Sequence, residues 1–509
     1  MSENLATILT QTAEDHGERI ALKFDDTEVS YEQVNEGSSR VAGMLAEKGF
    51  EVGDRIAVML PNVPYFALVY YGVLRAGGVV VPINPQYESS EVAYHLNDSG
   101  AKLLFAWHDF SDAAEKGAGE AEVEVITVAP DEFESMIGEA EAAYEVVERD
   151  SDDTGVILYT SGTTGDPKGS VLTHGNLQKS TDVVTGLVDM SEDDVILGAL
   201  PLFHVFGQAC GLNGATKLGA CLAMIPKFDP GTTLEVIARD GVTIFQGVPT
   251  MYSAVLGHED RESYDASSLR VAIVGGQAMP VDTLESFEEA FGIEVLEGYG
   301  LSETTAIGTF NQPGERKPGS IGKPVEGVEV RFFDDDGNEV DQGEVGELTI
   351  KGPNVMAEYW NKAEETKEEL RDGWFSTGDL GHIDEDGFVF IDDRKKDMII
   401  RGGENVYPRE IEEFLYGHPA VADVQVVGVP GERYGEEILA WVKPREGASA
   451  SPEEIREFCR GRIAHFKVPR YVLLTAEFPM TVTGKVQKYR LREMGIEALD
   501  LNPVVWRRA

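Results

Sequence analysis

The chain contains the stretch Tyr159-Thr-Ser-Gly-Thr-Thr-Gly-Asp-Pro-Lys-Gly169, which directly follows the apolar run Val156-Ile-Leu158. The apolar run is typical of a buried strand. The longer stretch combines hydroxyl side chains and glycines with one lysine, Lys168. Glycines let backbone N–H groups approach an anion, hydroxyls donate further hydrogen bonds, and a lysine adds positive charge. The pattern predicts a phosphate-binding loop at the end of a strand.

This loop differs from a Walker A motif, in which Gly-Lys is followed by Ser or Thr. Here Lys168 precedes Gly169. The alternative interpretation is a Ser/Gly-rich surface turn. The strand before the loop and its Pro-Lys-Gly ending argue against that alternative.

Length and composition indicate a globular protein of two or more domains. The chain has 509 residues, more than one core usually holds, and 42% of them are hydrophobic. Asp and Glu total 90 against 43 Lys and Arg, a formal net charge of -47. These acidic residues are spread along the chain without EF-hand spacing, so we interpret them as adaptation of a cytosolic protein to high salt. The negative charge argues against nucleic acid as a partner.

Cysteine usage and apolar runs favour a reducing cytoplasm. Cys210, Cys221 and Cys459 form no C-x-x-C pair, so neither a zinc site nor a disulfide framework is indicated. The amino-terminal residues lack a basic region followed by an apolar core, and no apolar run approaches the ~18 residues of a membrane span. We expect a cytoplasmic protein with at most peripheral membrane contact.

The apolar pattern predicts an α/β fold. Residues 1–150 alternate helical and strand patterns, such as a helix over 31–47 and a strand over 55–60, and residues 155–310 repeat the scheme. This alternation indicates two layered α/β subdomains with largely parallel sheets. Ligands of such sheets lie beyond the carboxyl ends of the strands, so the polar and glycine-bearing turns there are the candidate site.

Beyond residue 324 the pattern changes. Short strands separated by Asp-Gly turns indicate a small β subdomain that extends to residue 393. The remaining residues keep βαβ character, including helices over 408–416 and 452–463, and their number suits a separate domain. We predict a large amino-terminal domain over 1–393, a hinge over 394–397 and a small mobile α+β domain over 398–509.

Six motifs follow the loop. They are Pro201-Leu-Phe-His-Val-Phe-Gly207, Gly275-Gly-Gln-Ala-Met279, Glu297-Gly-Tyr-Gly-Leu-Ser-Glu303, Ser376-Thr-Gly-Asp-Leu380, Arg394-Lys-Lys-Asp-Met-Ile-Ile-Arg-Gly-Gly-Glu-Asn405 and Pro479-Met-Thr-Val-Thr-Gly-Lys485. In this order, over about residues 10–495, the motifs resemble the adenylate-forming superfamily of acyl-CoA synthetases, luciferases and peptide-synthetase adenylation domains. The most similar type is a medium- to long-chain fatty-acyl-CoA ligase.

The resemblance implies a two-step reaction that uses ATP, Mg²⁺ and CoA. A carboxylate attacks the α-phosphate of ATP to give an acyl-adenylate and pyrophosphate. The CoA thiol then attacks the adenylate to give a thioester and AMP. Catalysis of the first step depends mainly on placed cations and backbone donors around the phosphoryl centre.

The resemblance also implies roles for residues of the nucleotide site. The β/γ-phosphates are assigned to Thr160, Ser161, Gly162, Thr163, Thr164 and Lys168. The adenylate is assigned to Gly276, Gln277, Ala278, Glu297, Tyr299 and Ser302, with Tyr299 along the adenine. Glu303 matches the magnesium-associated glutamate, a residue type that suits a hard cation. Asp379 matches the ribose-binding aspartate, with Arg394 assisting, and Lys485 matches the lysine that bridges the carboxylate and the α-phosphate.

A second set of residues is implied for CoA, the hinge and the acyl group. Lys396 resembles the hinge position, at which the small domain turns between half-reactions. Gly402 and Gly403 would line the pantetheine tunnel, because a bare backbone leaves room for a narrow thiol arm. Lys227 matches a position that can meet the CoA phosphates, and a plain surface lysine remains open there. The acyl pocket is assigned to His204, Phe206, Gly207 and Gly298, with a packed core histidine as the alternative for His204.

Substrate and assembly stay open at this stage. Malonyl-CoA synthetases carry an arginine where Gly298 stands, so Gly298 argues against a dicarboxylate. An aromatic or other short acid remains possible, as does transfer to a carrier protein or a non-catalytic nucleotide sensor. The enzyme is expected to be a monomer or a homodimer.

We predict that fold and activity decay when salt falls below about 1 M, because the Debye length then grows from ~3 Å and the acidic side chains repel one another. Circular dichroism and activity measured over a KCl dilution series test this. Full activity in dilute buffer would contradict the interpretation of the acidity.

Overall fold

The structure is a computed structural model that describes residues 3–160, 167–402, 404–431, 433–445, 447–448, 451–480 and 486–501. The chain separates into two compact units. Unit 1 comprises Met1–Val330 with Ile350–Phe375, and unit 2 comprises Arg331–Thr349 with Ser376–Ala509. The chain passes between the units inside strands β16 (Glu329–Phe333), β17 (Gly346–Lys351) and β20 (Trp374–Ile383).

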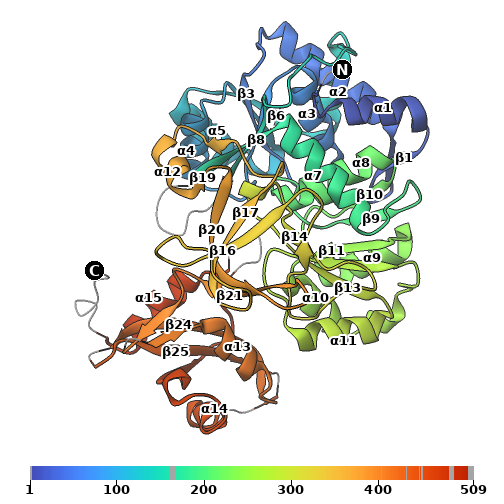
Figure 1. Cartoon of the computed structure of the whole chain (residues 1–509). Helices are drawn as coiled ribbons and strands as arrows, with labels where there is room; N and C mark the ends of the chain where they lie inside the picture. Colours follow the sequence, from blue (N-terminus) through green and yellow to red (C-terminus); the bar gives the residue numbers. More distant parts are fainter. Residues whose placement is uncertain are drawn as a thin grey trace. The chain divides into compact units, whose positions relative to one another are not determined.

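One sheet of unit 1 carries the strands on both sides of the predicted phosphate loop (Figure 1). Its order is β18-β8-β7-β4-β3-β5-β6. Strands β3 to β7 run parallel, whereas β8 is antiparallel to both β7 and β18. The bounds are β3 (Arg55–Met59), β4 (Val79–Pro82), β5 (Leu103–Trp107), β6 (Glu124–Val128), β7 (Thr154–Thr160), β8 (Lys168–Thr173) and β18 (Glu358–Tyr359).

The second sheet of unit 1 has the order β15-β14-β13-β12-β11-β9-β10-β1-β2. It is parallel from β1 to β13 and antiparallel at both edges. The predicted largely parallel sheets are therefore confirmed, with antiparallel strands added at their edges. The bounds are β1 (Ile20–Phe24), β2 (Thr27–Ser30), β9 (Val195–Gly198), β10 (Cys221–Met224), β11 (Ile244–Gly247), β12 (Val271–Val274), β13 (Glu294–Tyr299), β14 (Thr309–Phe310) and β15 (Lys323–Pro324).

Among the helices of unit 1, α2, α7 and α9 begin with a side-chain cap. Helix α2 (Tyr31–Glu47) has the predicted bounds and starts with a Ser30/Gln33 capping box, which satisfies the first backbone N–H groups. The others are α1 (Thr7–His16), α3 (Pro64–Arg75), α4 (Ser89–Ser99), α5 (Ser111–Ala121), α6 (Pro130–Glu139), α7 (His174–Leu187), α8 (Gly214–Leu218), α9 (Pro230–Asp240), α10 (Pro249–Leu256), α11 (Val281–Phe291) and α12 (Ala363–Glu369). Short 3₁₀ turns are η1 (His108–Phe110), η3 (Arg261–Ser263) and η4 (Ser302–Thr304).

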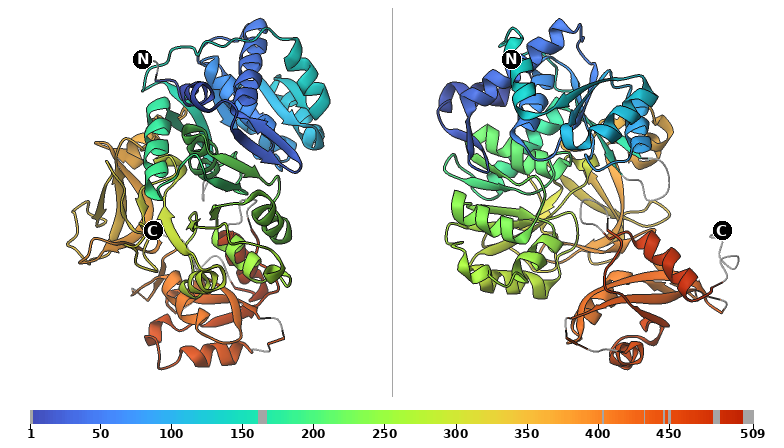
Figure 2. Two further views of the ribbon diagram at one scale, coloured as in Figure 1. Left: turned by 90° about the vertical axis from the view of Figure 1, so that its right-hand side faces the viewer. Right: turned by 180° about the vertical axis from the view of Figure 1, so that it is seen from behind.

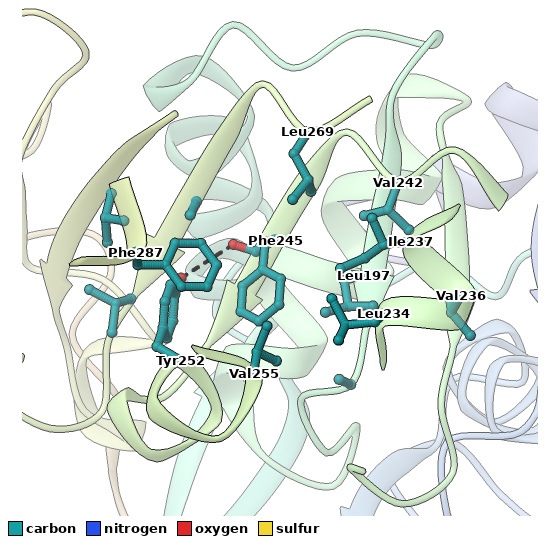
Figure 3. Close-up of a cluster of buried hydrophobic side chains, with 14 of the residues drawn as sticks. Leu197, Leu234, Val236, Ile237, Val242, Phe245, Tyr252, Val255, Leu269 and Phe287 are labelled. Carbon is teal, nitrogen blue, oxygen red and sulfur yellow. Dashed lines mark hydrogen bonds between the residues drawn. The ribbon is translucent and has the colours of Figure 1, made fainter. Parts of the chain in front are cut away.

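Helices α9, α10 and α11 cover one face of the second sheet (Figures 1 and 2). Three buried rings, Phe245, Tyr252 and Phe287, form the centre of this core, with centroids 4.7–5.4 Å apart (Figure 3). The Tyr252 hydroxyl donates to the Phe245 carbonyl at 3.5 Å. Buried aromatic rings contribute large apolar areas, so this contact stabilises the strands whose carboxyl ends carry the candidate site.

Unit 2 contains a sheet of order β23-β22-β25-β24 with β26 paired to β25. Successive residues of β24 and β25 face opposite sides, so Val424 and Ile438 pack on α13 and α14, whereas Val427 and Trp441 pack on α15. The bounds are β22 (Ile399–Arg401), β23 (Glu404–Val406), α13 (Pro408–Tyr416), β24 (Val421–Gly431), β25 (Gly435–Pro444), α14 (Pro452–Cys459), η5 (His465–Lys467), β26 (Tyr471–Leu474) and α15 (Lys488–Ala498). The remaining strands are β19 (Leu370–Arg371) in unit 1 and β21 (Val389–Arg394), which is antiparallel to β20.

One predicted helix is too long. The sequence pattern predicted a helix over 452–463, but α14 ends at Cys459. Arg460 is extended (φ -63°, ψ 129°), and Gly461 adopts φ +71°. A glycine in this left-handed region commonly ends a helix. The helix predicted over 408–416 is confirmed as α13.

Two observations concern the expectations about cysteines and membrane spans. Cys210, Cys221 and Cys459 are all buried and free. Among the residues that the structure describes, every helix is too short or too polar to span a lipid bilayer.

His174, the first residue of α7, links this helix to the amino-terminal segment. Its Nδ1 accepts a hydrogen bond from the Leu5 backbone N–H at 3.1 Å, and the side chain is fully buried. Burial, reinforced by Arg149, lowers the pKa of His174 to about 4. The imidazole is therefore neutral in the folded chain at neutral pH.

We predict that His174 makes unit 1 less stable in mild acid. A folded pKa below the unfolded value of ~6.5 means that the unfolded state binds the proton first, so stability falls as pH drops from about 6.5 towards 4. Between pH 7.5 and pH 5 this group alone accounts for a loss of about 2 kcal/mol. Denaturant unfolding of wild type and His174→Gln at both pH values, at constant molar salt, measures it. An unchanged stability difference between the two proteins at the two pH values would refute the assignment.

Candidate active site

The predicted phosphate loop lies between paired strands. Thr160 ends β7, Lys168 begins β8, and the two residues are opposite each other in the antiparallel register. The Thr160 hydroxyl donates to the Lys168 carbonyl at 3.4 Å. The predicted loop residues Ser161, Gly162, Thr163 and Thr164 lie outside the described residues. The hairpin therefore positions both ends of the predicted loop.

Lys168 lies in a hydrogen-bonded network that also contains Glu303. Its Nζ is 2.8 Å from Glu369 Oε1 and 4.8 Å from the centroid of the Tyr359 ring. The Tyr359 hydroxyl lies 3.0 Å from Glu303 Oε1 and 2.7 Å from Glu369 Oε2. Burial, followed by the charge of Glu303, raises the pKa of Tyr359 well above its usual value, so the phenol is protonated. The fold thus joins two predicted site residues through two that sequence analysis missed.

The missed residues differ in how visible they are in the sequence. Tyr359 stands in the aromatic stretch Glu358-Tyr-Trp-Asn361, which is visible in the sequence. Glu369 ends the run Lys367-Glu-Glu369 on α12, and nothing in that charged run distinguishes it from its neighbour. Only the pairing of β18 with β8 reveals it.

Glu303 is held by a turn of unusual backbone geometry. Thr305 and Ala306 adopt φ +47° and +78°, values that are costly for residues with a Cβ and above all for a β-branched threonine. Hydrogen bonds hold the turn: Ser180 Oγ donates to the Thr305 carbonyl at 2.5 Å, and Thr305 Oγ1 donates to the Asn354 carbonyl at 2.7 Å. The Met356 N–H donates to the Glu303 carbonyl at 2.8 Å. Such strain is common at functional sites, where the surrounding structure supports it.

The residues predicted to contact the adenylate lie in and around the turns that follow β12 and β13. Because these strands are parallel neighbours, their carboxyl ends lie at the same edge of the sheet. Gly276 adopts φ +81°, and the loop continues through Gln277 and Ala278. Glu297 is 3% exposed and its Oε1 accepts from the Met279 N–H at 3.2 Å, so it supports the loop from behind. Of the other predicted members, Tyr299 and Ser302 are half-buried.

The predicted acyl pocket combines His204 with an unusual helix. His204 Nδ1 accepts from the Phe206 N–H at 3.3 Å, which assigns the proton of the neutral ring to Nε2. Residues Gly207–Asn213 form a buried π-helix (η2), a rare conformation that is frequent at functional sites. Phe206 packs on a small apolar cluster of Leu200, Val248 and Met251.

Gly298 is sterically constrained. A Cβ added there would lie 2.8 Å from the Phe310 ring and 3.5 Å from the Thr309 carbonyl. A long side chain at this position would require Phe310 to move. The assignment of Gly298 to the acyl pocket stays a prediction.

Unit 2 brings Asp379 and Arg394 together. The two residues are opposite each other in the β20–β21 pair, and Arg394 Nε is 2.8 Å from Asp379 Oδ1. Asp379 is 2% exposed, and its N–H donates to Thr377 Oγ1 at 3.1 Å. Asp379 is thus fixed by its neighbours, as a carboxylate that binds ribose hydroxyls needs to be.

The residues predicted for the hinge and for CoA are divided between the two units: Lys396 and Gly402 belong to unit 2 and Lys227 to unit 1. Lys396 lies in the turn that follows β21, in which the Asp397 N–H donates to the Arg394 carbonyl at 2.9 Å. Gly402 adopts φ +66°, and a Cβ there would approach Tyr434 to 2.9 Å. Lys227, in unit 1, is exposed beyond β10. Gly403 and Lys485 lie outside the described residues.

Glu303 is the residue predicted to bind a magnesium ion together with ATP. Within the described ranges, no group of three or more His, Cys, Asp or Glu side chains is arranged to hold a metal. Mg²⁺ in nucleotide sites is usually bound by one or two carboxylates together with substrate phosphates. Glu303 is a carboxylate of this kind, and Tyr359 and Glu369 connect it to Lys168.

We predict that Gly300→Ala distorts the turn that carries Glu303. The new Cβ would lie 2.0 Å from the Ala306 carbonyl oxygen, a backbone atom within the strained turn. Overpacking of this kind costs about 2 kcal/mol of stability. Gly186→Ala is the control, because a Cβ there meets nothing within 4 Å and lies in helix α7, where alanine is favoured. Unfolding in denaturant should show opposite signs for the two variants, and equal stability would contradict the steric argument.

The chain is similar to known proteins over most of its length. The family described as "AMP-binding enzyme" matches residues 9–360, and the "AMP-binding enzyme C-terminal domain" matches residues 410–485. A long-chain-fatty-acid–CoA ligase of Bacillus subtilis is 36% identical, over 97% of this chain and 94% of its own. A feruloyl-CoA synthase of an Amycolatopsis species is 37% identical, over 93% and 95%. ATP-bound MatB from Rhodopseudomonas palustris superposes with a TM-score of 0.91 at 35% identity, over 97% and 99% of the two chains. The chain therefore belongs to the AMP-binding enzyme family.

Proposed function

We propose that this protein is an AMP-forming acid–thiol ligase that activates a medium- to long-chain fatty acid with ATP and transfers it to CoA. The observation that carries the proposal is the network that joins Lys168 and Glu303, since these residues are 135 positions apart and the reaction needs a phosphate-binding cation beside a metal-binding carboxylate. Membership of the family and the similarity to a long-chain-fatty-acid–CoA ligase support the same reaction.

In the first half-reaction, a carboxylate oxygen of the fatty acid attacks the α-phosphorus of ATP. The bond between the α-phosphorus and its bridging oxygen breaks, and pyrophosphate leaves. Lys168 and the loop residues neutralise the leaving phosphates, and Lys485 bridges the carboxylate and the α-phosphate. Glu303 would hold a Mg²⁺ ion, which would offset charge on the phosphate oxygens. Asp379 accepts hydrogen bonds from the ribose hydroxyls, while Arg394 holds Asp379 in place. His204 lies at the acyl carboxylate.

In the second half-reaction, the thiolate of CoA attacks the acyl carbonyl and AMP leaves. We assign the turn between half-reactions to the hinge at Lys396, so that the carboxyl-terminal domain withdraws Lys485 and presents Gly402 and Gly403 to the pantetheine arm. Lys227 meets the CoA phosphates. The proposed domain boundary at residue 393 follows from this cycle. It differs from the division into compact units.

The substrate is the least constrained part of the proposal. The similarity to a long-chain-fatty-acid–CoA ligase favours a fatty acid, and the similarity to a feruloyl-CoA synthase favours an aromatic acid as the second candidate. The apolar cluster around Phe206 suits either. We also propose a cytoplasmic location, which suits free buried thiols, and a monomeric or homodimeric enzyme adapted to high salt.

Pyrophosphate release in ATP, Mg²⁺ and molar KCl tests the function, with acids from C2 to C18, malonate and 4-coumarate, each with and without CoA. We predict a maximum at medium to long chain length that increases when CoA is added. Lys485→Ala should lose pyrophosphate release but still transfer acyl groups from a supplied acyl-adenylate to CoA, because its role is confined to the first step.

The other outcomes separate the alternatives. A maximum with 4-coumarate or malonate would keep the chemistry and replace the substrate. Stimulation by a carrier protein instead of CoA would replace the acceptor. No release with any acid would leave a nucleotide-binding protein without catalysis.

A further inference from the structure

Glu369 forms an ion pair with Lys168, the residue that the proposed function assigns to the nucleotide phosphates. Its two carboxylate oxygens are both engaged: Oε1 with Lys168 Nζ at 2.8 Å and Oε2 with the Tyr359 hydroxyl at 2.7 Å. A carboxylate and a phosphate are both anionic oxygen acceptors, so they compete for the same ammonium group. We call Lys168, Glu303, Tyr359 and Glu369 the Tyr359 network.

The position of Glu369 is built into the fold. Strand β18 pairs with β8, which places Tyr359 opposite Ser170, two residues from Lys168. The Trp360 N–H donates to the Gly169 carbonyl at 2.7 Å, and the Tyr359 N–H donates to Thr366 Oγ1 at 2.9 Å. The second bond attaches the middle of α12 to β18, and Glu369 lies at the end of this helix, three residues beyond Thr366. The contact with Lys168 therefore follows from backbone pairing and not from a chance surface encounter.

The pair remains accessible to an incoming anion. The side chains of Lys168 and Glu369 are 27% and 34% exposed, whereas Tyr359 is 3% exposed. Ion pairs with this much exposure contribute little net stability, so a polyphosphate with several negative charges can replace the carboxylate. Tyr359 remains a fixed, buried centre during such an exchange.

Tyr359 connects the exchange to Glu303. A phenol has one proton, so it can donate to only one of the two carboxylates at a time. While Lys168 neutralises Glu369, the proton is available to Glu303. Once Lys168 turns to a phosphate, Glu369 loses its cation and becomes the stronger acceptor for the phenol. The Glu303 carboxylate then loses the hydrogen bond from the phenol, so its charge attracts a metal ion more strongly.

We propose that Glu369 is an internal competitor of the nucleotide polyphosphate for Lys168, and that Tyr359 couples polyphosphate binding to metal binding at Glu303. This proposal rests on the proposed function and adds a positioning pair to it. It explains why a carboxylate lies next to a lysine that has to bind phosphate. Competition from Glu369 also favours release of pyrophosphate, because the ion pair between Glu369 and Lys168 re-forms as pyrophosphate leaves.

Glu369→Gln tests the competition, with Glu368→Gln as the matched control. Both variants remove one negative charge from α12, but Glu368 is exposed and makes no side-chain contact to Lys168 in the described part of the chain. Calorimetry with magnesium pyrophosphate in molar KCl should show binding about 3- to 10-fold tighter in Glu369→Gln than in wild type, with Glu368→Gln unchanged. The KM for ATP should fall by a similar factor.

Equal affinities in the two variants would overturn the proposal, because the effect would then be one of general charge. Weaker pyrophosphate binding in Glu369→Gln would also overturn it, because Glu369 would then be assisting the phosphates. Failure of the proposed function is distinguishable: wild type itself would neither bind magnesium pyrophosphate nor release pyrophosphate with any acid.

Tyr359→Phe tests the coupling. In wild type, we expect the affinity for pyrophosphate to rise several-fold as the Mg²⁺ concentration is raised. In the same way, we expect half-saturation with Mg²⁺ at a lower Mg²⁺ concentration when pyrophosphate is present. The phenylalanine variant should lose at least part of this mutual dependence, while its unfolding midpoint confirms that it is folded. Unchanged dependence in a folded variant would refute the role of the phenol, and an unfolded variant leaves Glu369→Gln as the deciding measurement.

Discussion

The pairing of strand β8 with β7 on one side and β18 on the other is the interaction on which the rest of the site depends. Strand β7 brings the start of the predicted phosphate loop and β8 begins with Lys168, so the hairpin fixes the ends of the loop. Strand β18 then adds a segment from nearly 200 residues further along the chain. The backbone hydrogen bonds between β18 and β8 are what bring Tyr359 and Glu369 close to Lys168.

A second constraint is the strained turn after β13. This turn brings Glu303 within hydrogen-bond distance of Tyr359 on β18, and its Thr305 and Ala306 have energetically unfavourable φ values. Ser180 and Asn354 supply the hydrogen bonds that support it, and they come from parts of unit 1 far apart in sequence. The core around Phe245 and Tyr252 holds the strands that deliver this turn. Stability of the core and geometry of the site are therefore linked.

The strongly acidic composition coexists with local pairing of charge in both units. In unit 2, the fully buried Glu437 is met by Arg401 at 2.7 Å and Arg470 at 2.9 Å, and Lys488 of α15 pairs with Glu412 of α13 at 2.8 Å. Buried charges require such partners, whereas exposed carboxylates do not. The excess negative charge is consequently a property of the surface, where salt can screen it.

The sequence by itself determined the fold class, most element positions and the motif set, because apolar periodicity, capping residues and glycine turns act locally. It predicted α2 and α13 at their observed bounds, and it identified Lys168, Glu303 and Asp379 as site candidates. The helix predicted over 452–463 was too long because the apolar pattern continues to Ile463, although Gly461 adopts a left-handed conformation that ends helices. Only the tertiary structure decided which residues share a network. Glu369 is one acidic residue among many in the sequence, and long-range strand pairing, which leaves no local signal, places it on Lys168.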